Sequence, residues 1–166
     1  MTLAATDLSR RNFLTGRART APPPLRPPWT REEAIASACT GCGACIDACP
    51  EAILSPGSNG RPMLSFAENE CTFCRACADA CPEPVFLEAN ERAFAHVAAI
   101  EESCFAKTGV HCQSCGDACP ETAIRFRPRL GGAPVPEIEA GRCTGCGACA
   151  AICPAHAIIM NTPETA

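Results

Sequence analysis

The residues of this sequence best suited to chemistry are its cysteines, which form four groups of four. A thiolate can attack an electrophile, form a disulfide or bind a soft metal. The groups are Cys39, Cys42, Cys45 and Cys49; Cys71, Cys74, Cys77 and Cys81; Cys104, Cys112, Cys115 and Cys119; and Cys143, Cys146, Cys149 and Cys153. Each group ends in Cys-Pro, so one supersecondary unit recurs four times along the chain.

The spacing within the groups favours iron–sulfur clusters over disulfides or zinc. Three groups read C-x2-C-x2-C-x3-C-P, and the third has seven residues between its first two cysteines. Cysteines this close in sequence are badly placed to bridge one another, because disulfide geometry is narrow. Structural zinc prefers two C-x2-C pairs separated by a longer loop. The observed run is the one that holds [4Fe–4S] clusters in bacterial ferredoxins, so we expect all sixteen cysteines to ligate four such clusters.

The longer gap in the third group makes Cys104 the ligand that the spacing defines least. His111 directly precedes Cys112 and would be the alternative ligand if Cys104 took no part. Because Cys104 completes a set of four thiolates, we expect Cys104 rather than His111 in the site.

Short apolar stretches flank the cysteine groups and predict strands. These stretches are residues 52–54, 63–66, 85–87, 96–100, 123–126, 135–138 and 157–160. Residues 88–102 also fit a helix. Residues 29–38 predict a helix before the first group, with Thr30 and Glu33 as a capping box and Trp29 packed on Ala34.

An ordinary apolar core would be thin in this chain. Alanine and cysteine supply much of the 47% hydrophobic content, aromatic residues are 5%, and tyrosine is absent. Clusters would therefore fill the interior, and the small residues between the cysteines would let the backbone approach them. The pattern over residues 39–160 resembles a duplicated ferredoxin fold of the small bacterial 2[4Fe–4S] type. The predicted class is α+β, with short strands and short helices around the clusters.

We divide the chain into an arm and four motif segments. The arm, residues 1–29, is rich in arginine and proline and is expected to be flexible. The four [4Fe–4S] motif segments are residues 30–59, 60–91, 92–128 and 134–163.

Two pairings of the motifs into units fit the sequence. In two-cluster ferredoxins the fourth cysteine of each motif binds the other cluster of the pair. Adjacent pairing unites motifs one with two and three with four. Nested pairing unites two with three and one with four, as in the four-cluster electron-transfer subunits of molybdenum oxidoreductases, which the chain partly resembles. A helix rather than a strand before the first motif favours nesting.

Charge and motifs narrow the functional class. Residues 1–31 carry six arginines and one aspartate, whereas the whole chain has a net charge of −4. The acidic body argues against nucleic-acid binding, and no apolar run reaches the ~18 residues of a membrane span. No paired carboxylates or nucleotide-binding glycine motif indicate an enzyme, so we expect an electron-transfer or accessory protein.

The arm contains one specific motif. Residues 9–14 read S-R-R-N-F-L, which resembles the twin-arginine export motif. Neither an apolar segment nor a cleavage site follows it, so we expect the protein to stay in the cytoplasm.

Four cluster motifs, one of them stretched, behind such an arm resemble the ferredoxin-type proteins of the periplasmic nitrate reductase system. The resemblance implies a cytoplasmic iron–sulfur protein that binds the molybdenum-containing catalytic subunit before its export. It implies help with that subunit's maturation by one-electron or cluster-related chemistry, and we expect Arg10, Arg11, Phe13 and Leu14 to bind this partner. The alternative is a general electron-transfer ferredoxin between a dehydrogenase and an oxidoreductase.

Overall fold

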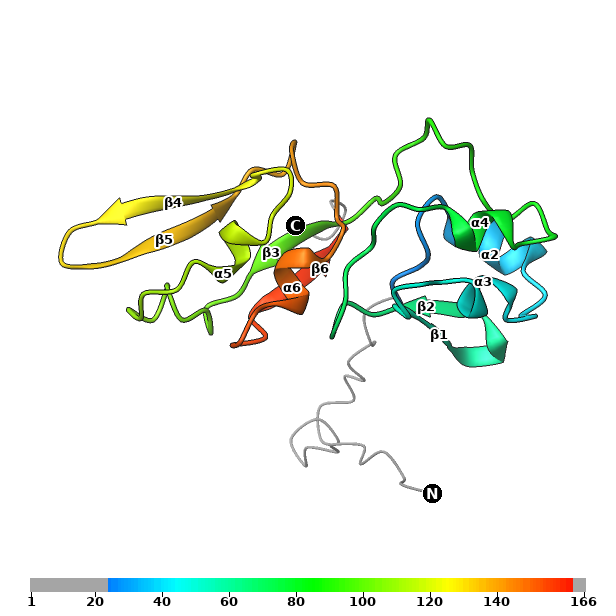
Figure 1. Cartoon of the computed structure of the whole chain (residues 1–166), viewed down its shortest axis with the longest axis horizontal. Helices are drawn as coiled ribbons and strands as arrows, with labels where there is room; N and C mark the ends of the chain where they lie inside the picture. Colours follow the sequence, from blue (N-terminus) through cyan, green and yellow to red (C-terminus); the bar gives the residue numbers. More distant parts are fainter. Residues whose placement is uncertain (1–23, 163–166) are drawn as a thin grey trace, which may run out of the picture.

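The computed structural model describes residues 24–162 and arranges them in two lobes along the long axis of the molecule (Figure 1). The first unit contains α2 (Glu32–Ala38), α3 (Ala44–Asp47), β1 (Leu54–Pro56), the 3₁₀ turn η1 (Ser58–Gly60), β2 (Pro62–Leu64) and α4 (Ala76–Asp79). The second unit contains β3 (Val97–Ile100), α5 (Ser114–Asp117), β4 (Ile124–Arg129), β5 (Gly132–Ile138), α6 (Ala148–Ala151) and β6 (Ile158–Asn161). Short helices and two-stranded sheets make both units small α+β structures.

Strand pairing in the second unit joins the third motif to the fourth. β3, which precedes motif three, is antiparallel to β6, which follows motif four, with Ala98 opposite Met160. β4, which follows motif three, is antiparallel to β5, which precedes motif four, with Ile124 opposite Ile138. This β4–β5 hairpin extends away from the first unit at one end of the molecule (Figure 1). The segment 96–100, which also fitted a helix, is therefore strand β3.

The first unit repeats this arrangement with fewer hydrogen bonds. β1 after motif one pairs antiparallel with β2 before motif two, with Leu54 opposite Leu64. The place of the β3–β6 pair is taken by a single antiparallel bridge between Thr30 and Phe86. Motifs one and two therefore form one unit, and the nested pairing that the sequence favoured is wrong. The reason is that Thr30, before motif one, pairs as a minimal strand, although no full strand forms there.

Residues 24–29 pack on the first unit, although the sequence assigned them to the flexible arm. Pro27 and Trp29 are buried. The Leu64 N–H donates to the Leu25 carbonyl at 2.9 Å. The Arg26 guanidinium donates to the Pro62 carbonyl at 2.9 Å and to the Glu32 carboxylate at 2.6 Å. The remainder of the expected arm, residues 1–23, lies outside the described residues.

Helix α2 lacks the predicted capping box. Its N-cap residue is Arg31, which makes no side-chain cap. The Thr30 hydroxyl donates instead to the Pro27 carbonyl at 2.7 Å, because the backbone of Thr30 is committed to the bridge with Phe86. The Trp29 ring packs edge-on against Phe73, 6.1 Å between centroids, rather than serving as a staple to α2.

The two units meet through aromatic side chains between motif two and motif four. Phe66 and Phe94 belong to the apolar cluster of the first unit, and Ala150 and Met160 of the second unit pack against that cluster. His96 is buried and stacks on Phe94 with 4.6 Å between ring centroids. The units therefore share apolar surface in addition to the connecting chain.

Candidate metal centres

Each motif places three cysteines on a loop and short helix, and sends its fourth cysteine to the other site of the same unit. Site I is a pocket whose lining includes Cys39, Cys42, Cys45 and Cys81. Site II is a pocket whose lining includes Cys49, Cys71, Cys74 and Cys77. Cys49 and Cys81 are thus exchanged between motifs one and two.

The second unit repeats the exchange. Site IV is a pocket whose lining includes Cys119, Cys143, Cys146 and Cys149. Site III comprises Cys104, Cys112, Cys115 and Cys153. Cys104 and Cys153 pack in one cluster, and the charges of Cys104, Cys112 and Cys153 raise the pKa of Cys115. All sixteen predicted cysteines are therefore gathered, as free thiols, into four sets of four.

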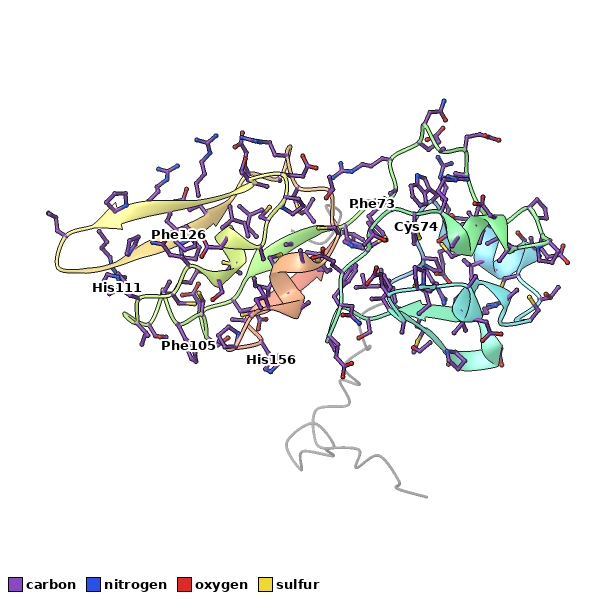
Figure 2. The ribbon with its side chains drawn as sticks, in the orientation of Figure 1. Phe73, Cys74, Phe105, His111, Phe126 and His156 are labelled. Carbon is purple, nitrogen blue, oxygen red and sulfur yellow. The ribbon has the colours of Figure 1, made fainter. Side chains whose placement is uncertain are left out.

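The longer gap of the third motif does not remove Cys104 from its site. Cys104 is buried and packs with Ala157 and Cys153. His111 is exposed, and Figure 2 shows it at the outer part of the second unit, away from the first unit. Residues 105–111 form a turn that leads back to Cys112, and this turn holds the extra chain length.

The four sites form a series. Cys45 of site I lies close enough to Cys77 of site II for its charge to raise the pKa of Cys77. Cys146 of site IV likewise raises the pKa of Cys71 of site II. The Cys71 N–H also donates to the Cys146 carbonyl at 2.8 Å. The charge of Cys115 of site III raises the pKa of Cys149 of site IV. The order through the molecule is therefore I, II, IV, III, with II and IV meeting at the junction of the units.

Burial makes the thiolate costly without a metal at the third cysteine of each motif and at Cys71, the first cysteine of motif two. Burial raises the pKa of Cys71 and Cys115 to about 11 and that of Cys77 and Cys149 to about 12. The charge of neighbouring thiols contributes to the same rise. A bound metal reverses this preference, since a coordinating thiol is held deprotonated.

Backbone geometry directs N–H groups at several sulfurs. The Ala123 N–H donates to Cys119 Sγ at 3.3 Å, and the Ala157 N–H donates to Cys153 Sγ at 3.4 Å. The Ala98 N–H donates to Cys143 Sγ at 3.5 Å. Hydrogen bonds to cluster sulfurs stabilise negative charge and help to set reduction potentials.

The donor set fits a polynuclear cluster. Within residues 24–162, no three side chains of His, Cys, Asp or Glu converge on a position for a single metal ion. At sites I, II and IV four thiols line one pocket, as the ligands of a [4Fe–4S] cube must. One buried nitrogen, Arg75 Nη1, has no hydrogen-bond partner in the described residues and belongs to a residue that lines site II. Such an unpartnered donor suits an anionic cluster.

Paired units that exchange cysteines between two four-thiol sites define a [4Fe–4S] ferredoxin-type protein, which is an electron-transfer protein. Two protein-family models, both described as a 4Fe-4S dicluster domain, match residues 38–86 and 110–157. Their division of the chain agrees with the adjacent pairing of motifs.

Similarity to curated proteins specifies the family further. The chain is 47% identical over 153 residues to the ferredoxin-type protein NapF of Escherichia coli K12, covering 92% of this chain and 93% of that protein. It is 38% identical over 166 residues to the ferredoxin-type protein NapF of Haemophilus influenzae, covering 93% of this chain and 94% of that protein. The chain therefore belongs to the NapF family of ferredoxin-type proteins. None of the helices in residues 24–162 has the length and apolar character needed to cross a bilayer.

Motif two contains features that the sequence analysis missed. Motifs one and four have glycine at two loop positions with positive φ, whereas motif two has Phe73 at φ 57° and Arg75 at φ 63°. Aligning the motifs would have shown these two substitutions. Figure 2 places Phe73 and Cys74 on the side of the first unit that faces the second. The predicted partner-binding residues Arg10, Arg11, Phe13 and Leu14 lie outside the described residues.

Proposed function

We propose that this protein carries four [4Fe–4S] clusters, one at each of sites I to IV, with all sixteen cysteines as ligands. When bound, each cluster supplies one-electron transfer. The protein holds the ligands and donates backbone N–H groups to Cys119, Cys143 and Cys153. The close succession of sites through the molecule supports passage of electrons from one end to the other.

The physiological role that we propose is assistance to the molybdenum-containing catalytic subunit of periplasmic nitrate reductase. The observation that carries this proposal is the extent of similarity to NapF proteins, which covers 92% of the chain and so reaches beyond the two matched cluster domains. The partner would be bound before its export, so both proteins would meet in the cytoplasm. Docking would use the arm, and the clusters would supply one-electron or cluster-related chemistry during maturation.

Substitutions in the arm test this role. We expect Arg10→Ala/Arg11→Ala/Phe13→Ala/Leu14→Ala to abolish anaerobic capture of the purified catalytic-subunit precursor while leaving the iron content unchanged. Arg17→Ala/Arg19→Ala removes the same number of positive charges from the arm and should retain capture. Intact capture and intact nitrate reductase activity after deletion of residues 1–19 would refute a role of the arm in maturation.

A general electron carrier is the second candidate, and the series of four sites is the observation that favours it. Such a carrier would transfer electrons between a dehydrogenase and an oxidoreductase without any need for the arm. It predicts that deletion of residues 1–19 changes neither the reduction of the protein nor the physiological process that it serves.

A further inference from the structure

Arg75 occupies a position where the other motifs have an uncharged residue. The residue after the second cysteine of each motif is Gly43, Arg75, Gln113 and Gly147 in turn. Both glycines have the left-handed backbone conformation, with φ of 86° and 89°, and Gln113 avoids it with φ −134°. Arg75 adopts φ 63°, which a side chain disfavours. Non-glycine residues kept in such conformations cluster at functional sites.

The guanidinium of Arg75 is held by Trp29, which precedes motif one, and by the Leu87 carbonyl, which follows motif two. Its Cζ lies 4.8 Å from the centroid of the Trp29 ring, a cation–π contact. Its Nη2 donates to the Leu87 carbonyl at 3.2 Å. Trp29 is itself fixed, since its indole Nε1 donates to the Glu91 carbonyl at 3.1 Å. The side chain is therefore positioned rather than free in solvent.

The remaining nitrogen of Arg75 lacks a protein partner. Nη1 is buried and makes no hydrogen bond in the described residues, and no carboxylate of residues 24–162 forms an ion pair with Arg75. Glu51 and Arg75 are the two charged residues among those that line site II. A buried donor without an acceptor costs folding free energy, and a charged donor costs more. Binding of an acceptor removes this cost.

We propose that Arg75 is the residue that makes site II the most readily reduced of the four sites. This proposal rests on the proposed cluster at site II. One-electron reduction adds one negative charge at the site and moves no proton. A guanidinium stays protonated at all relevant pH values, so it stabilises the reduced form more than the oxidised form. The Nη1–H group would donate toward cluster sulfur, which is the acceptor that it lacks in the protein.

Site II lies between site I and site IV in the series, so its ease of reduction determines where an electron stays. Site II borders site I through Cys45 and Cys77 and borders site IV through Cys71 and Cys146. An electron that enters at either end of the molecule would therefore come to rest beside the junction of the units.

Redox titration of the intact, anaerobically purified protein, reduced with dithionite in the presence of mediators and followed by electron paramagnetic resonance, tests the proposal. We expect the first signal to belong to site II, identified as the signal that Cys74→Ser alters. Arg75→Gln and Arg75→Gly should shift the midpoint of this signal to more negative potential and leave the other three midpoints in place. Arg75→Lys should shift it less, because the charge is kept.

The controls separate this effect from folding and from cluster loss. Arg129→Gln removes an arginine from the distant β4–β5 hairpin and should shift no midpoint. Glycine suits the backbone at position 75, so Arg75→Gly should keep the full iron content. Unchanged midpoints in Arg75→Gly and Arg75→Gln, first reduction at another site, or iron loss in Arg75→Gly would overturn the proposal. An iron content that lacks site II in the unmodified protein would instead refute the proposed function.

Discussion

Cys49 and Cys81 are the residues that make one unit out of motifs one and two. Each lies after the short helix of its own motif, and each lines the site formed by the other motif. A cluster at either site would therefore be held by both motifs at once. Loss of either cysteine should affect the site across the unit rather than its own.

Alanine substitutions reveal this exchange. Cys49→Ala should remove or alter the same paramagnetic signal as Cys74→Ala, because both residues line site II. Nested pairing would instead make Cys49→Ala match Cys146→Ala of motif four. Comparison of the three reduced spectra at equal iron loading decides between these pairings.

The stretched third motif allows a test of whether Cys104 or His111 is the ligand at site III. Cys104→Ala should lower the iron content from about 16 to about 12 atoms per chain, because site III would lose a ligand. His111→Ala should leave the content at about 16, since His111 is exposed while Cys104 is buried. Equal iron loss in both variants, measured by metal analysis, would show that His111 takes part in the site.

The role of the cysteines as ligands could be predicted from their spacing, whereas the side-chain contacts of other residues could not. The regular intervals predicted the four groups, because each ligand loop is local in sequence. The role of Arg75 depends on Trp29 and Leu87, which approach it only through folding. The failed capping box has the same origin, since Thr30 is held by Pro27 and by the bridge to Phe86.

The four short helices are the elements that present the third cysteine of each motif. Each has four residues, far fewer than the ~12 that an isolated helix needs for marginal stability. They depend instead on the loop before them and on packing around the site. At α6 that packing is tight, because a Cβ on Gly147 would collide with the ring of Phe66.

Gly43 and Gly147 occupy equivalent positions in motifs one and four, so alanine substitutions there separate the energetic cost of backbone strain from that of packing. Gly147→Ala should destabilise the protein by about 2–5 kcal/mol, the sum of left-handed backbone strain and a forced shift of Phe66. Gly43→Ala has a similar φ but open space around the new Cβ, so only about 1–2 kcal/mol of strain is expected. Anaerobic thermal unfolding of both variants measures the difference, and equal losses would rule out the packing contribution of Phe66.

Most of the strands were predicted, because alternating or short apolar runs beside Cys-Pro are a local signal. β3, β4, β5 and β6 all overlap predicted stretches, although β4 and β5 each extend three residues further into the hairpin. Residues 85–87 form only the bridge at Phe86, since their partner segment at Thr30 is too short for a sheet. The pairing of motifs could not be predicted, because the gaps between groups are similar and pairing depends on these long-range contacts.

At the scale of the whole molecule, two units are joined by a buried junction rather than by a linker alone. His96 Nε2 donates to the Gly145 carbonyl at 3.0 Å, and burial lowers the His96 pKa, so the ring is neutral near pH 7. The Arg92 guanidinium donates to the Cys143 carbonyl at 3.2 Å. These contacts tie the loop of motif four to residues 92–96, which connect the two units.

Iron removal should unfold much of the described structure. The apolar core is small, and buried thiols such as Cys77 and Cys149 surround cavities that the clusters would fill. Cluster binding therefore stands in for core packing. Far-ultraviolet circular dichroism and proteolysis after anaerobic chelation should show loss of structure in both units, and a protease-resistant apoprotein with an unchanged spectrum would contradict this expectation.

The central claim is that two units hold four [4Fe–4S] clusters on sixteen cysteines. Mössbauer spectroscopy of the anaerobically isolated, ⁵⁷Fe-labelled protein, scaled to total iron and protein, tests it most directly. We expect about 16 iron atoms per chain, all in [4Fe–4S] clusters. About 8 iron atoms, or iron held as single ions, would contradict it.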